Sequence, residues 1–262
     1  MGSSDSMMSQ EDEQKARYLG WDACYNAREV GGYPTGNGGR IRRRVLVRAD
    51  NLHRLTPEGQ AALREYGVGT VIDLRLAHEL EQHPNPFAAG HGPRYHNLPL
   101  HDLETGEEID AAKSTLDGYV IMVEKGKGVV AAIIKAIAAG LKEGGVLVHC
   151  HGGKDRTGIV VALLLSLVEV PRETIAADYA LSEAMLEAPN LAWLEEQSKA
   201  LGRPVERPEW MHARPETMLG LLDHLDRQYG GVENYLEAAG VTQAEIAQIR
   251  KHLIALPDDT GD

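Results

Sequence analysis

Cysteine and positive charge are both scarce in this chain of 262 residues. Its two cysteines, Cys24 and Cys150, are too few for a disulfide framework or for a zinc site built from cysteines. Lysine and arginine number 27 against 39 aspartates and glutamates, which gives a net charge of -12. A general attraction to nucleic acid or to an anionic membrane is therefore excluded, and we expect no nucleic-acid partner. The role of Cys150 has to be sought in chemistry.

Long hydrophobic runs are also missing. The longest, residues 159–168, is about half of the ~20 residues that a bilayer crossing needs, and it predicts a buried helix. Residues 1–15 carry no apolar segment behind a basic one, and their Gly-Ser-Ser opening resembles an expression leader. We expect no stable membrane insertion, and a location in the cytoplasm or export without a recognisable signal peptide.

Short β-branched runs alternate with helical patterns along the first two thirds of the chain. Strands are expected at residues 45–48, 70–74, 95–98 and 146–149. Helices are expected at residues 57–66, 159–168, 171–182, 218–229 and 246–253, with two helices or one kinked helix over 116–141. No strand is expected after Val170. This order predicts an α/β fold with a mostly parallel central sheet flanked by helices and a helical C-terminal part.

The domain organisation follows from length and composition. Apolar residues make up 43 % and charged residues 25 % of the chain, as in soluble globular proteins with a sizeable core. We expect a leader over 1–15, a single domain over 16–256 and a tail over 257–262. Within that domain, a proline- and tryptophan-containing stretch over 182–214 is expected to form either a helical lid or a helical hairpin.

The strongest chemical signal is the segment 146–158, Val-Leu-Val-His-Cys-His-Gly-Gly-Lys-Asp-Arg-Thr-Gly, in which a strand leads through a loop into an apolar helix. Gly152 and Gly153 allow the backbone to turn so that successive N–H groups converge. The positive end of the following helix dipole points into the same space. Such a loop is suited to a tetrahedral dianion.

Three side chains of this loop have the chemistry of phosphate transfer. The amides and the helix end stabilise a thiolate, so Cys150 is expected to be a nucleophile. Arg156, six positions later, can donate two parallel hydrogen bonds to phosphate oxygens. Thr157 can aim its hydroxyl at the sulfur and ease its departure in a second step. A core cysteine that happens to precede a glycine turn would not explain this combination.

His-Cys-x-x-Gly-Lys-Asp-Arg-Thr-Gly resembles the signature of cysteine-dependent phosphatases of the protein tyrosine phosphatase superfamily, in the lysine-aspartate form of the bacterial atypical tyrosine and phosphoinositide phosphatases. Other segments resemble that family's motifs in the expected order. They are residues 26–33, residues 71–75 with Glu79, residues 98–102, residues 229–231 and residues 235–236. The similarity covers roughly residues 20–255. Two departures are Glu29, where the family usually has Asp, and His151, where the typical member carries an aromatic residue.

The resemblance implies a protein tyrosine phosphatase-like fold and hydrolysis of phosphomonoesters through a phosphocysteine intermediate, with dual or broad specificity. The implied partners are a phosphorylated protein, a phosphoinositide lipid or a small phosphorylated molecule. It places the general acid at Asp102, after the third strand, while Asp155 inside the loop is the second candidate. His151, Gly152, Gly153, Lys154 and Asp155 are expected to contact the substrate. No cofactor and no metal are expected.

The charged residues near these motifs have further interpretations. Lys154 can present its charge at the mouth of the pocket, where the resemblance associates it with lipid-phosphate substrates. Asp73 and Arg75 are expected to form a structural ion pair rather than to act in catalysis. Arginines 40, 42, 43, 44 and 48 are expected to be a solvated face beside an edge strand, with attraction of anionic headgroups as the alternative. Histidines 78, 83, 91, 96 and 101 match no compact metal-ligand spacing.

Two other functions share the same loop chemistry. A rhodanese-like sulfurtransferase also has a cysteine at a strand-to-helix anion loop, although Arg156-Thr157-Gly158 and an acid at Asp102 fit phosphate hydrolysis better. A phosphatase of a nucleotide or sugar phosphate would use the same residues on a smaller substrate. An inactive phosphate-binding module would not need Cys150, Arg156 and Thr157 together.

Overall fold

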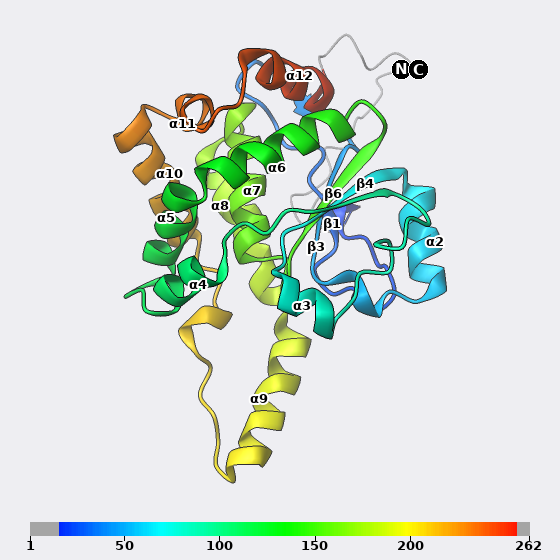
Figure 1. The fold of residues 1–262 in the computed structure, drawn as a ribbon, viewed down its shortest axis with the longest axis vertical. Helices are drawn as coiled ribbons and strands as arrows, with labels where there is room; N and C mark the ends of the chain where they lie inside the picture. Colours follow the sequence, from blue (N-terminus) through cyan, green and yellow to red (C-terminus); the bar gives the residue numbers. More distant parts are fainter. Residues whose placement is uncertain (1–15, 256–262) are drawn as a thin grey trace, which may run out of the picture.

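The computed structural model describes residues 16–255 and has a five-stranded sheet at its centre (Figure 1). The expected leader 1–15 and tail 257–262 lie outside the described residues. The sheet has the order β1 (Arg28–Glu29), β3 (Leu46–Ala49), β6 (Gly145–His149), β4 (Val68–Asp73), β5 (Arg94–Asn97). β1 runs antiparallel to β3 and all other neighbours are parallel. The expected α/β fold with a mostly parallel sheet is confirmed.

Helices cover both faces of the sheet. The α-helices of the described residues are α2 (Pro57–Tyr66), α3 (Ala77–Gln82), α4 (Leu103–Asp110), α5 (Thr115–Lys125), α6 (Lys127–Gly140), α7 (Asp155–Leu167), α8 (Arg172–Met185), α9 (Glu187–Leu201), α10 (Pro215–Tyr229), α11 (Val232–Ala238) and α12 (Gln243–Leu253). Two short 3-10 helices, η1 (Leu52–Arg54) and η2 (Glu209–Met211), complete the set. The 116–141 region forms two helices because Gly126 interrupts it, and a Cβ there would lie 2.4 Å from the carbonyl oxygen of Met122.

Alternate strand residues serve two separate cores, as the pleat of a sheet requires. Leu46 and Val146 face the larger core, which α5 to α8 and α10 to α12 complete. Val47 and Leu147, one position later, face a smaller core beneath α2 and η1. Strands buried on both faces explain why their sequences are continuous apolar runs.

Two expectations about strands are wrong. A strand does occur after Val170, because β7 (Ile254–Ala255) pairs antiparallel with β2 (Arg40–Ile41) in a second, two-stranded sheet. β3 is not an edge strand, since it lies between β1 and β6. Arg48, on β3, is therefore 1 % exposed rather than part of a solvated face.

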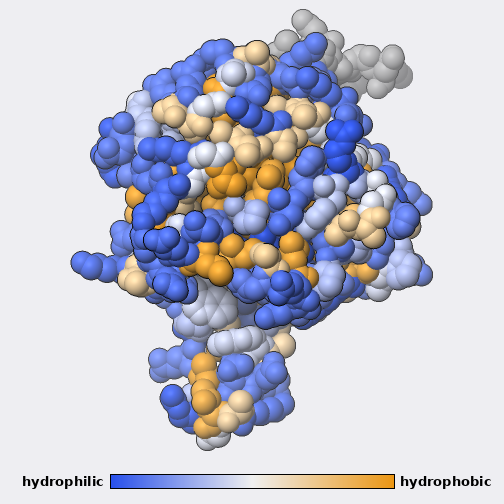
Figure 2. All heavy atoms as spheres, in the orientation of Figure 1, coloured by the Kyte–Doolittle hydropathy of each residue, from blue (hydrophilic) through white to orange (hydrophobic). Residues whose placement is uncertain are grey.

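The 182–214 stretch does not form a helical hairpin, and its role as a lid stays a prediction. α9 projects away from the body of the molecule, and the chain returns along it as an extended segment that ends at η2 (Figure 1). No residue of α9 is buried. Hydrophobic side chains are exposed on this arm (Figure 2), among them Leu191, Leu201 and Trp210. We call α9 and residues 202–210 the α9 arm.

Candidate active site

Cys150 follows β6 directly, at the edge where the parallel strands β3, β6 and β4 all end. It is 2 % exposed and lines a pocket of about 520 Å³. The pocket is bounded by the loop 150–156, by residues that follow β3, and by the α9 arm. Functional residues of open α/β sheets gather at this carboxyl edge of the strands.

The loop turns its carbonyl groups away from the pocket, where side chains and backbone from other elements hold them. The carbonyl of His151 accepts from the backbone N–H of Asn51 at 2.8 Å. The carbonyl of Gly152 accepts from Asn26 Nδ2, and that of Gly153 from Arg48 Nη2, both at 2.8 Å. Because the carbonyls are held outward, the intervening N–H groups face inward. The N-terminus of α7 has no side-chain cap, so its first amides are available to an anion as well.

Gly153 makes this turn sterically feasible. Its φ of +65° lies in the left-handed region, and a Cβ at this position would lie 2.3 Å from the carbonyl oxygen of Ala49. The loop therefore packs against the end of β3 more closely than any side chain would allow. This contact sets the position of the loop relative to the sheet.

Arg156 is held in a two-pronged ion pair with Glu79 of α3. Its Nη1 lies 2.5 Å from Glu79 Oε2, and its Nη2 lies 2.8 Å from Glu79 Oε1. Burial by itself would raise the pKa of Glu79, but the hydrogen bonds and charge of Arg156 outweigh it and lower that pKa to about 2. Glu79 is thus ionised throughout the neutral range and fixes the plane of the guanidinium beside Cys150.

A second buried ion cluster supports the loop from the side of α8. Asp178 accepts from Arg48 Nη1 at 2.5 Å, from Arg28 Nε at 3.2 Å and from the Tyr33 hydroxyl at 3.0 Å. Burial opposes the charge of Asp178, but the two guanidinium groups hold its pKa at about 2. Since Arg48 also donates to Gly153, the carboxylate of α8 orients a residue that supports the anion loop.

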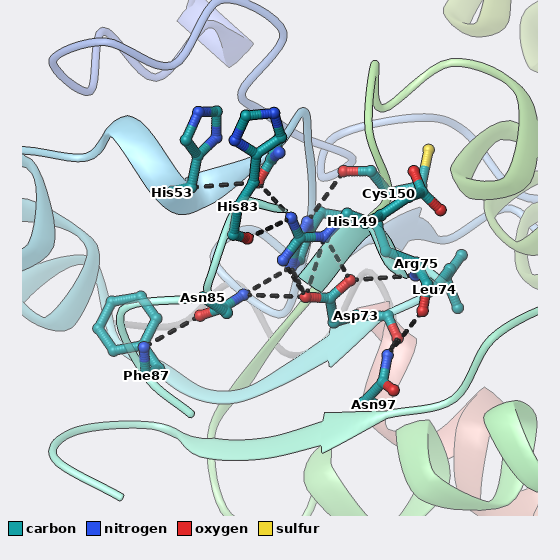
Figure 3. A network of polar contacts seen from close by, with 12 residues as sticks. His53, Asp73, Leu74, Arg75, His83, Asn85, Phe87, Asn97, His149 and Cys150 are labelled. Carbon is teal, nitrogen blue, oxygen red and sulfur yellow. Dashed lines mark hydrogen bonds and ion pairs between the residues drawn. The ribbon is translucent and has the colours of Figure 1, made fainter. Parts of the chain in front are cut away.

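Asp73 and Arg75 form the expected structural ion pair, with Arg75 Nη2 lying 2.7 Å from Asp73 Oδ2. Both side chains are fully buried beneath the loop (Figure 3). Burial alone would raise the pKa of Asp73, but His149 and Arg75 hold it well below its usual range. Arg75 also donates to Asn51 Oδ1 and to the carbonyl of His83. The pair links β4 to the residues at the pocket rim.

The two candidates for the general acid lie in different hollows. Asp155, in the first turn of α7, lines the Cys150 pocket and accepts from the Tyr119 hydroxyl at 2.6 Å. Asp102 is the N-cap of α4 and accepts from the Thr105 amide at 2.8 Å. That amide lowers the pKa of Asp102. Asp102 lines a neighbouring hollow of about 960 Å³ between α3, α4 and α6, and not the pocket of Cys150.

Comparison with known proteins places this geometry in a family. The sequence matches the model of a family described as "Tyrosine phosphatase family" over residues 19–255. The chain belongs to this family. The resemblance of the loop and of the other motifs is thereby confirmed, and the phosphatase is a phosphoric monoester hydrolase rather than a sulfurtransferase.

Relatives of this phosphatase come from several bacteria. The tyrosine-protein phosphatase of Nostoc commune is 35 % identical over 221 residues, which cover 80 % of this chain and 74 % of the relative. The triple specificity protein phosphatase PtpB of Mycobacterium tuberculosis is 27 % identical over 259 residues, covering 80 % of this chain and 90 % of the relative. The crystal structure of P. aeruginosa TpbA matches with a TM-score of 0.35 and 18 % identity, covering 54 % of this chain and 71 % of that chain.

Lys154 of the phosphatase does not present a free ammonium at the mouth of the pocket. Its side chain is 4 % exposed and donates to the carbonyl of Trp210 and, at 3.0 Å, to that of His212. It also lies 3.4 Å from Asp155 Oδ1. Lys154 lines the pocket, but its charge ties the anion loop to the end of the α9 arm.

The remaining expected site residues lie in or beside the loop. The hydroxyl of Thr157 is buried and has no hydrogen-bond partner among the described residues, so it is not engaged elsewhere. His151 and Gly152 both line the pocket. The side chain of His151 is 62 % exposed and belongs to the rim rather than the floor.

Several residues that line the pocket lie outside the loop motif and were not predicted from the sequence. His53 and Asn51 follow β3, and His83 follows α3, yet all three line the pocket with Cys150. The topology could have indicated the first two, because β3 and β6 are parallel neighbours and their C-terminal ends must meet. Trp193 and Trp210 of the α9 arm pack edge to face at 5.4 Å and line the opposite wall.

Residues 16–255 contain neither a cluster of metal-ligating side chains nor a membrane-spanning helix. No group of three or more His, Cys, Asp or Glu side chains in this range is arranged to hold a metal ion. No helix in the same range has the length and apolar character to cross a bilayer.

Proposed function

We propose that this phosphatase hydrolyses phosphotyrosine in proteins, with Cys150 as the nucleophile. The observation that carries the proposal is that a buried cysteine, the glycine-containing loop and a guanidinium fixed by Glu79 share one pocket. The tryptophan-lined wall suits an aryl phosphate, because a phenyl ring can stack against indole. A phosphoinositide or a small phosphorylated metabolite would have to use the same loop without that contact.

The reaction proceeds in two displacements. The sulfur of Cys150 forms a bond to phosphorus while the bond to the phenolic oxygen breaks, and the loop amides and Arg156 bind the three equatorial oxygens. The leaving oxygen takes a proton from a carboxylic acid. Water then attacks the phosphocysteine, giving up a proton to the same carboxylate, and the thiolate leaves as inorganic phosphate is released. The hydroxyl of Thr157 donates a hydrogen bond to the sulfur and so stabilises the departing thiolate.

Asp155 is the carboxylic acid in this proposal. It lines the same pocket as Cys150, whereas Asp102 is engaged in capping α4 beside another hollow. Asp155→Asn should lower kcat on a phosphotyrosine peptide by about 10²-fold or more, and less on p-nitrophenyl phosphate, whose leaving group needs little protonation. Asp102→Asn is the matched variant. If Asp102→Asn shows this leaving-group dependence and Asp155→Asn does not, the assignment is reversed.

Hydrolysis in the presence of a chelator tests the function itself. The wild type should release phosphate from a phosphotyrosine peptide without added metal. Cys150→Ser should lose at least about 10³-fold in kcat while still binding the peptide, because the loop amides remain. Cys24→Ser, which removes the other cysteine, should retain activity. Turnover that survives Cys150→Ser, or a panel in which phosphoinositides far exceed phosphopeptides in kcat/KM, would contradict the proposal.

A further inference from the structure

Three histidine rings form one wall of the Cys150 pocket. His53 comes from η1, His83 from the C-terminal cap of α3, and His151 from the anion loop. The ring centroids of His53 and His83 are 4.3 Å apart, and those of His83 and His151 are 6.4 Å apart. The rings of His53 and His83 point to the same side as the Cys150 sulfur (Figure 3). We call these three residues the histidine wall.

Two nitrogen atoms at this wall have no partner in the protein. His53 Nε2 accepts from Arg54 Nε at 3.2 Å, so the proton of the neutral ring is on Nδ1. That Nδ1 is buried and has no hydrogen-bond partner among the described residues. Asn51 also lines the pocket and is 6 % exposed. Its Nδ2 likewise has no hydrogen-bond partner among the described residues. Buried donors without acceptors are costly, and an acceptor supplied by a ligand would satisfy them.

Arginines predominate among the charged groups that act on His53 and His151, while Asp50, Asp155 and Glu196 also line the pocket. Arg54 and Arg75 face His53, while Arg75, Arg156 and Glu79 face His151. Glu79 is the one carboxylate in this set, lying 3.9 Å from His151 Nδ1, and its oxygens are already paired with Arg156.

These surroundings favour the neutral form of His53 and His151. Burial, followed by the neighbouring positive charges, lowers the pKa of His53 to about 4. Partial burial of the His151 ring, followed by the charge of Arg156, lowers the pKa of that residue as well. A negative group placed among the rings would offset those charges, raise the pKa values of His53 and His151 and favour their protonation. Binding of such a group therefore strengthens as the pH falls.

We propose that the histidine wall binds a second anionic group of the substrate, next to the phosphate being hydrolysed, and so selects phosphotyrosine peptides with an acidic flank. The inference rests on the proposed phosphotyrosine hydrolysis and deepens it. A carboxylate or a second phosphate in the flank offers the same acceptor chemistry to the unpartnered nitrogens. The wall is set beside the phosphate loop, so the residues adjoining the phosphotyrosine are the ones it would contact.

The test compares two phosphotyrosine peptides that differ only in glutamates against glutamines beside the phosphotyrosine. The measured quantity is the ratio of their kcat/KM values at pH 7.5 and pH 5.5, in which the titration of the shared phosphate largely cancels. For the wild type we expect the ratio to rise by about fivefold or more as the pH falls, as one added charge near the flank would give. A third peptide with phosphoserine in the flank separates a phosphate preference from a carboxylate preference.

Variants of the wall decide whether it is responsible. His53→Asn with His83→Asn should abolish the rise in the ratio, and the single His83→Asn, at a half-buried position, should reduce it. His91→Asn, at an exposed residue that lines neither hollow, is the matched control and should behave as the wild type.

Three results would be decisive against one claim or the other. A ratio that does not change with pH in the wild type overturns the role of the wall, as does a rise that survives in the double variant. Failure to hydrolyse either peptide and p-nitrophenyl phosphate would instead overturn the proposed function.

Discussion

Arg156 can bind a phosphate in the right plane only if something fixes its guanidinium before substrate arrives. Glu79 does this with two hydrogen bonds and belongs to α3, an element separate from the loop. Pre-orientation matters because misplacement of a binding group by about 1 Å can cost on the order of 10²-fold in rate. At the residue scale, Glu79 is thus a positioning residue, and it acts through Arg156.

Glu79→Gln should therefore reduce activity although Glu79 is not the nucleophile or the acid. The side-chain amide of glutamine has one oxygen that can still accept from Arg156. Its NH2 group would face the second N–H of Arg156, and two donors cannot form a hydrogen bond. We expect a fall of about 10- to 100-fold in kcat/KM, with KM for phosphopeptide raised and the binding of vanadate weakened. Steady-state kinetics and vanadate inhibition measure this. Glu81→Gln, on the exposed side of the same helix, is the control, and an equal loss there would argue against specific positioning.

The α9 arm is the element whose conformation bears most directly on access to Cys150. Its residues Ala188, Pro189 and Trp193 line one wall of the pocket, yet α9 itself has no buried residue. A helix that packs so little against the body is held mainly at its ends. At the C-terminal end of the arm, Lys154 donates to the carbonyls of Trp210 and His212, and Glu183 accepts from the backbone amide of Ala213.

We expect the α9 arm, which lies within the stretch 182–214, to act as a mobile lid. Trypsin should cut after exposed Lys199, and vanadate in the pocket should slow that cut by several-fold because it holds the arm against the loop. Mass spectrometry of timed digests measures the rate. Cleavage at Lys142, exposed in the turn before β6, is the internal reference. A cut after Lys199 whose rate is independent of vanadate would contradict the lid.

α8 and β3 are joined by the buried contact of Asp178 with Arg28 and Arg48. Asp178→Asn removes the only negative charge in this contact and leaves two buried guanidinium groups repelling each other. The expected loss is about 3–5 kcal/mol in the free energy of unfolding, since breaking a buried pair leaves an uncompensated charge. Urea unfolding at pH 7 measures it. The control is Asp223→Asn. Asp223 lies exposed on α10 and pairs with Arg172 of α8, so its loss should lower the free energy of unfolding by no more than about 1 kcal/mol.

The whole molecule should lose stability in acid for a related reason. Asp178 and Glu79 have pKa values of about 2 in the folded protein, below their ordinary values of 3.8 and 4.5. Their contribution is therefore present above about pH 4.5 and is lost as the pH falls toward 2. Urea unfolding at pH 7, 4.5 and 3 should give similar stability at the first two values and a clear loss at the third. Asp178→Asn should lessen that loss, and an unchanged acid profile in this variant would contradict the assignment.

Prediction from the sequence succeeded where a residue's role depends on its near neighbours in the chain. The helix expected at residues 57–66 begins at Pro57 with Thr56 as its cap, and the last expected helix begins with a capping box between Thr242 and Glu245. The strand, glycines and helix around Cys150 are likewise contiguous. Lys154 was misplaced because its partners, the carbonyls of Trp210 and His212, lie more than fifty residues away.

The sequence alone determined the α/β fold, the family and the loop that brings a thiol, amides and a guanidinium together, because those features depend on local backbone preferences and on short spacings. Only the tertiary structure decided which residues share the pocket with that loop. His53, Glu79 and Trp193 come from η1, α3 and α9, and their proximity to Cys150 results from strand order and helix packing. The hydrophobic periodicity of the sequence does not predict such contacts. They are made between elements whose relative placement is set by the burial of two separate cores.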